Sequence, residues 1–159
     1  MASDSPATKK QKTQPHYELL YHPGLPGRGE YIRLLFEAAG VPYTDVANQQ
    51  ENGYSFVQAI IDPKATECEE GNPPAFAPPA LKVPGAGMNG KTLVISQTPN
   101  VLSYLGPRLG LVPEEEPLAL YVNQIALTAL DLSNEAHDTH HPGKVLLCFI
   151  GHTSRTNTD

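Results

Sequence analysis

Two short stretches carry residue types that can hold a small anion and donate a hydrogen bond to it. Gln97 and Thr98 open a predicted helix, and the free N–H groups of a first helical turn bind anions. Tyr21 ends a predicted strand and gives way to a loop at residues 22–27 that is rich in Pro and Gly. A phenol donates one hydrogen bond through its O–H. These residues predict a site in which an anion rests on a helix N-terminus and a phenol points at it.

The elements that must position these residues follow from the spacing of apolar residues, prolines and glycines. The sequence predicts strands at 17–21, 43–46, 80–83 and 93–96, and helices at 30–39, 54–61 and 97–109. The order βαβαββα supplies parallel strands in its first half and a hairpin in its second. We therefore expect an α/β domain with a thioredoxin-like fold, which is a four-stranded mixed sheet with helices on both faces.

The pattern changes after Leu111. Residues 113–116 (PEEE) are typical of a helix start, because Pro fits the first turn and acidic groups favour the positive end of the helix dipole. Apolar residues then recur at helical spacing, which predicts one long amphipathic helix at 114–136. We expect a disordered tail at 1–15, the thioredoxin-like domain at 16–111, part of an all-α domain at 112–142 and an unrelated tail at 143–159.

The composition excludes several classes of protein. The chain has 159 residues, of which 40% are hydrophobic and 18% charged, as in soluble globular proteins. A formal charge of −6 argues against a nucleic-acid partner. The longest apolar run, at 145–150, is far shorter than the roughly 20 residues of a membrane helix. Two cysteines without CxxC spacing favour a reduced, cytoplasmic setting. Lysines 9, 10 and 12 could form a nuclear address, but a solvated tail is favoured.

Four motifs, in the order of the family, resemble the cytosolic glutathione transferases, and among them a fungal-like group of the tyrosine type. They are the strand-end Tyr21, residues 27–30 (GRGE), residues 78–81 (PPAL), and residues 97–100 (QTPN) with Tyr104 and Leu105. The resemblance covers about 17–142. It implies glutathione as co-substrate with no other cofactor and no metal, an electrophilic small molecule as second substrate, and a homodimer.

The resemblance also implies a role for each matched residue. Tyr21 would donate its O–H to the glutathione sulfur and stabilise the thiolate, which is the reactive form. Gln97 and Thr98 would bind the γ-glutamyl carboxylate. Pro79 matches a cis-proline that turns the preceding residue toward glutathione; that residue is here Pro78, which has no N–H to offer. The alternatives are a packed tyrosine, a simple helix cap and an extended loop.

Two charged residues are weaker matches. Arg28 would hold the carboxylate side of the site or join a dimer contact, and the alternative is an ordinary exposed charge. Asp131 resembles an acidic residue that reaches glutathione across the dimer, and the alternative is a solvated helix charge. His22 is interpreted as a passive neighbour of Tyr21 or a second proton acceptor. Tyr17 is a weaker candidate than Tyr21 because it begins the strand.

Three rival signals do not support a different site. Residues 24–29 read GxxGxG, which is not the GxGxxG of a dinucleotide loop. His137, Asp138, His140 and His141 resemble a metal cluster, but Pro142 ends the helix there, so a polar helix end is favoured. Cys68 lies in an acidic loop that would raise its pKa, so we do not expect it to act as a nucleophile.

The family resemblance predicts a transferase that conjugates glutathione thiolate to an electrophile, in detoxification or secondary metabolite biosynthesis. The alternatives are a non-catalytic binding or interaction module, and a glutathione-dependent peroxidase or isomerase. Full transferases have several helices after the first domain, whereas one is predicted here. Gly143-Lys144 is compatible with a splice-donor-like codon pair, which suggests a retained intron or a mispredicted gene end. The exposed face of the long helix predicts association or poor solubility.

Overall fold

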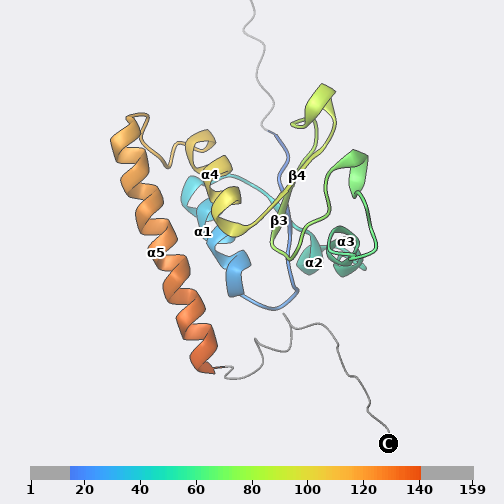
Figure 1. Ribbon diagram of the computed structural model, residues 1–159. Helices are drawn as coiled ribbons and strands as arrows, with labels where there is room; N and C mark the ends of the chain where they lie inside the picture. The colour runs from blue at the N-terminus through green and yellow to red at the C-terminus, as the bar shows by residue number, and fades with distance from the viewer. Residues whose placement is uncertain (1–14, 141–159) are drawn as a thin grey trace, which may run out of the picture. The chain divides into compact units, whose positions relative to one another are not determined.

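The computed structural model of the chain describes residues 15–140 (Figure 1). The predictions for the tails at 1–15 and 143–159 therefore lie outside the described residues, apart from Pro15. The chain divides into two compact units, with the boundary between Leu109 and Gly110.

The first unit contains the predicted strands and helices in the predicted order. Its elements are β1 (Glu18–Leu20), α1 (Glu30–Ala39), β2 (Thr44–Asp45), α2 (Val46–Gln49), α3 (Tyr54–Ile60), β3 (Ala80–Val83), β4 (Leu93–Ser96) and α4 (Thr98–Arg108). Three 3₁₀ turns, η1 (Gly27–Gly29), η2 (Glu69–Gly71) and η3 (Met88–Gly90), lie in the connections. The four-stranded mixed sheet with helices on both faces is thus confirmed.

One element differs from the sequence prediction. The strand expected at 43–46 ends at Asp45, and Val46 begins the short helix α2. The side chain of Gln49 folds back and accepts a hydrogen bond from the Asp45 backbone N–H at 3.1 Å. That bond, together with the burial of Val46, closes a helical turn where the β-branched residues suggested an extended chain.

The strands run in the order β2-β1-β3-β4, with β1 parallel to β2 and antiparallel to β3. Leu20 pairs with Ala80, and Ala80 pairs with Ser96. These three residues form one row across the sheet at the end of β1, the start of β3 and the end of β4. The residues just beyond this row, Tyr21, Pro79 and Gln97, consequently leave the sheet at the same end.

Each face of the sheet has its own hydrophobic core, because successive side chains of a strand point to opposite faces. Helices α1 and α4 cover one face, and α2 and α3 cover the other (Figure 1). The first core is built from Tyr17, Leu19, Tyr21, Ile32, Phe36, Leu81, Val83, Val101 and Leu105. The second is built from Leu20, Val46, Val57, Ile60, Ala75, Ala80 and Val94.

Helix α1 shows how the sequence fixes a core element. Ile32 and Phe36, four residues apart, are fully buried on one face of the helix. The Phe36 ring stacks on Tyr43, with ring centroids 4.6 Å apart. Gly40 then ends the helix at φ 63°, a left-handed conformation that glycine adopts without a steric penalty.

The second unit contains α5 (Glu116–His140), which is the helix predicted at 114–136. Several large apolar side chains of this helix are exposed, among them Leu120, Tyr121, Ile125 and Leu132. Within residues 15–140, no helix combines the length and the apolar character that crossing a bilayer requires.

Truncation of Phe36 tests the first core. We expect Phe36→Ala to lower the free energy of unfolding by about 3–5 kcal/mol, because it removes a fully buried aromatic ring and leaves a cavity. Leu34→Ala, at an exposed position of the same helix, is the control and should change it by less than about 0.5 kcal/mol. Urea unfolding followed by circular dichroism measures both, and equal losses would contradict this packing.

Candidate active site

Tyr21 lies directly after β1, and its side chain packs beneath the loop that precedes α1. Only 8% of the residue is exposed. A Cβ at either Gly27 or Gly29 would overlap the phenol, so both positions must be glycine for the ring to lie there. The hydroxyl oxygen of Tyr21 accepts a hydrogen bond from the Arg28 backbone N–H at 3.0 Å. The two glycines and the N–H of Arg28 between them therefore hold the phenol in one orientation.

The start of α4 meets the same residue. Gln97 precedes the helix with φ 71° and ψ 115°, and its side chain makes no capping hydrogen bond. Thr98 is 3% exposed, and its hydroxyl donates to the Arg28 carbonyl at 3.4 Å. Arg28 thus contacts Tyr21 through its N–H and Thr98 through its C=O. The structure brings Tyr21, Arg28 and Thr98 together, although seventy residues separate Arg28 from Thr98 in the chain.

Pro78 and Pro79 lie at the same end of the sheet. The peptide bond between them is cis, the geometry that the sequence resemblance implies. Pro79 is buried and leads directly into Ala80, the β3 member of the row with Leu20 and Ser96. A contact of the Pro78 carbonyl with glutathione remains a prediction.

The charged candidates are less constrained. The Arg28 residue is exposed, and a carboxylate-binding role for its guanidinium remains a prediction. Asp131 is exposed on α5, in the second unit, and its predicted role at the site also remains untested. His22 was interpreted as a passive neighbour of Tyr21 or a second proton acceptor. Its Nδ1 lies 3.2 Å from the Tyr54 hydroxyl. No sequence signal identified Tyr54, because it lies 32 residues away in α3.

A largely buried ion pair between Arg33 and Asp45 carries no signal in the sequence. Arg33 Nε donates to Asp45 Oδ2 at 2.7 Å, and Arg33 Nη1 contacts Glu30 Oε2 at 2.9 Å. Burial alone would lower the pKa of Arg33, but its hydrogen bonds to these two carboxylates raise the pKa above its ordinary value. Arg33 therefore stays charged beside the Tyr21 ring, 5.8 Å from the ring centroid.

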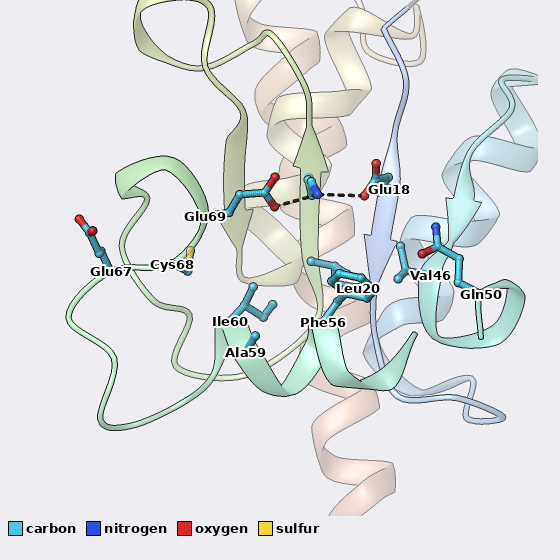
Figure 2. A pocket seen from close by; sticks show the side chains of 11 residues that line it. Glu18, Leu20, Val46, Gln50, Phe56, Ala59, Ile60, Glu67, Cys68 and Glu69 are labelled. Carbon is cyan, nitrogen blue, oxygen red and sulfur yellow. Dashed lines mark ion pairs between the residues drawn. The ribbon is translucent and has the colours of Figure 1, made fainter. Parts of the chain in front are cut away.

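A cavity of about 490 Å³ lies on the other face of the sheet (Figure 2). Its apolar lining comes from Leu20, Val46, Phe56, Ala59 and Ile60. Lys82 Nζ lies 2.7 Å from Glu69 Oε2 and 3.4 Å from Glu18 Oε2. Figure 2 labels both glutamates and marks the two ion pairs with dashed lines. Tyr21 and the start of α4 do not line this cavity, so it is separate from the residues around Arg28.

Cys68 lines the same cavity, with its thiol partly buried against the α2/α3 core. Burial raises the pKa of this thiol, and the charges of Glu69 and Glu67 raise it further. The expected direction of the shift is confirmed, although burial and not the acidic loop is its main cause. A thiol of this kind is largely protonated near neutral pH and is a poor nucleophile.

The histidine-rich end of α5 resembles a metal site in sequence. His137 Nδ1 lies 3.4 Å from Asp138 Oδ1, whereas the His140 side chain and His141 lie outside the described part of the chain. Among the side chains that the structure describes, no group of three or more His, Cys, Asp or Glu is placed to hold a metal ion.

The chain is similar in structure to glutathione transferases. It matches the glutathione S-transferase of Ascaris lumbricoides with a TM-score of 0.55 and 25% identity, over 79% of this chain and 51% of that one. A Nu-class transferase of Haemonchus contortus gives 0.53 and 24%, over 79% and 51%. A nematode-specific transferase of C. elegans gives 0.52 and 24%, over 78% and 51%.

These matches confirm the fold class, a thioredoxin-like domain followed by helical structure. The chain spans about half the length of the solved structures it matches. The matches do not support the fungal-like group of the tyrosine type that the sequence resembles. No protein-family model and no curated protein matches the chain.

The low reactivity of Cys68 is directly measurable. Alkylation requires the thiolate, so a raised pKa shifts the pH profile of the reaction toward higher pH. We expect Cys68 to react more slowly with iodoacetamide at neutral pH in the folded chain than in the chain unfolded by urea. Peptide mapping by mass spectrometry separates Cys68 from Cys148. Faster reaction in the folded chain would contradict the direction of this shift.

Proposed function

We propose that this chain is a glutathione-transferase-like protein of the tyrosine type, which conjugates glutathione to an electrophilic small molecule. One observation carries the proposal. The backbone of Arg28 binds the Tyr21 hydroxyl on one side and the Thr98 hydroxyl at the start of α4 on the other. The phenol and the helix N-terminus therefore lie next to each other. One small peptide could then place its thiol at the phenol and its carboxylate at the helix N-terminus.

The orientation of Tyr21 supports its role with the thiol. Because the phenol oxygen accepts a hydrogen bond from Arg28, its own hydrogen is free to point at a different acceptor. In the proposed reaction, the glutathione thiol loses its proton to water, and Tyr21 donates to the resulting thiolate. The sulfur lone pair forms a C–S bond to the electrophilic carbon. In a substitution, the leaving group departs with the electrons of its bond.

The carboxylate end of glutathione would rest on the first turn of α4. Its backbone N–H groups and the positive end of the helix dipole favour an anion. Gln97 is exposed at this turn, so its amide is available to a ligand, whereas Thr98 is buried and helps to fix the turn against Arg28. The Pro78 carbonyl and the Arg28 guanidinium would complete the site.

We assign the protein to the cytoplasm as a homodimer in which Asp131 reaches glutathione of the other subunit. Glutathione serves as co-substrate, and no metal or further cofactor takes part. The conjugation of the organic electrophile serves either detoxification or secondary metabolite biosynthesis.

A matched pair of tyrosine variants tests the catalytic role. Tyr21→Phe removes a hydrogen bond to a charged sulfur, which is worth about 1.5–3 kcal/mol. The pKa of bound glutathione should therefore rise by roughly 1–2 units, since one unit corresponds to about 1.4 kcal/mol. Tyr17→Phe is the control, because this buried tyrosine begins the same segment and packs against Phe36. Thiolate absorbance against pH measures both variants, and equal effects would refute the assignment.

Retention and turnover separate catalysis from simple binding. We expect the full chain to be retained on immobilised glutathione and to conjugate glutathione to an aromatic halide. Gln97→Ala should weaken retention by about tenfold, as loss of a hydrogen bond to a carboxylate does. Retention without turnover would identify a non-catalytic binding module, and failure of both in folded protein would refute both readings.

A further inference from the structure

The loop at residues 22–29 carries the amide that orients Tyr21, and two side chains from outside the loop hold it. Arg33 Nη1 donates to the carbonyl oxygens of Leu25 and Pro26, at 3.1 and 3.3 Å. Asn48 Oδ1 accepts from the Gly24 backbone N–H at 2.9 Å. Arg33 belongs to α1 and Asn48 to α2, so the loop is tied at two points to two different helices.

Both of these side chains converge on one carboxylate oxygen. Asp45 Oδ2 accepts from Arg33 Nε at 2.7 Å and from Asn48 Nδ2 at 2.9 Å. Asp45 is 5% exposed and lies at the junction of β2 and α2. The turn of the short helix α2 brings the Asn48 side chain to the carboxylate of Asp45, which precedes it by three residues. A single buried acid therefore sets the position of both anchors.

The geometry of this pair argues against stability as its main use. Among the described residues, Asp45 Oδ1 and Arg33 Nη2 are buried without a hydrogen-bond partner. A buried ion pair gains net stability only when its geometry is good and its remaining polar atoms are satisfied. Here Asp45 Oδ1 and Arg33 Nη2 are left without a partner, whereas Arg33 Nη1 contacts two carbonyl oxygens of the loop as well as Glu30. The contacts that are made fit a role in fixing the loop.

We propose that Asp45 is a positioning residue, which acts through Arg33 and Asn48 to hold the loop in the conformation that places the Arg28 amide on the Tyr21 hydroxyl. Asp45 itself touches neither Tyr21 nor a ligand in this assignment. Its effect on catalysis rests on the proposed function of Tyr21, whereas its effect on the loop does not.

Hydrogen exchange of backbone amides in the full chain tests the positioning without glutathione. Asp45→Asn keeps the shape of the side chain and removes the charge that holds Arg33. We expect the amides of Gly24 and Arg28 to exchange roughly tenfold faster, because each loses a fixed acceptor. The Leu81 amide in β3 reports on global unfolding. Faster exchange that is equal at all three amides would mean a merely structural role and would overturn the proposal.

Two further variants keep the test decisive if Asp45→Asn does not fold. Asn48→Ala changes an exposed residue and removes one anchor, so it should release the Gly24 amide alone. Glu30→Gln removes the other carboxylate partner of Arg33 but leaves Asp45 in place, and it should leave the Gly24 and Arg28 amides protected. Unchanged exchange at Gly24 in Asn48→Ala would contradict the proposal.

The thiol titration then connects the loop to catalysis. In Asp45→Asn, the pKa of bound glutathione should rise in the same direction as in Tyr21→Phe, while Glu30→Gln leaves it unchanged. A released loop with an unchanged thiol pKa would refute the link from Asp45 to Tyr21. If the unmodified chain binds no glutathione, the proposed function fails, and the exchange result still decides whether Asp45 holds the loop.

Discussion

The site depends on the backbone of one residue, Arg28, being bound from both sides. Its N–H donates to the Tyr21 hydroxyl, and its C=O accepts from the Thr98 hydroxyl. Two side chains that lie far apart in the sequence of the first unit thus bind the same residue. The flanking glycines, Gly27 and Gly29, make this possible, because a Cβ at either position would overlap the phenol. A hydrogen-bonded peptide of this kind fixes direction as well as distance.

The sheet explains why these side chains can meet. Leu20, Ala80 and Ser96 share one row, so the chain leaves β1, enters β3 and leaves β4 at one end of the sheet. Separate cores on the two faces hold this register, since a slip of one residue would exchange the buried and exposed faces of every strand. The register therefore determines which residues gather at the site before any polar contact forms.

The sequence was informative wherever the signal is local. Strand and helix order, the glycine that ends α1 and the strand-end position of Tyr21 all follow from short-range patterns. The hydrogen bonds of Asp45 with Arg33 and Asn48 were not predictable from the sequence. These side chains and the loop carbonyls meet only after α1 crosses from β1 to β2. The end of β2 at Asp45 was missed for a related reason. A side-chain contact from Gln49 overrode the extended preference of the β-branched residues.

In the proposed complex, one small peptide ligand spans the Tyr21 phenol and the first turn of α4. A crystal structure of the full chain with glutathione would show whether it does. We expect the sulfur within hydrogen-bond distance of the Tyr21 hydroxyl, with Arg28 still bound to that oxygen, and the γ-glutamyl carboxylate at the amides around Thr98. Glutathione bound elsewhere, such as in the cavity beside Lys82, or bound with its sulfur turned away from Tyr21, would refute this binding mode.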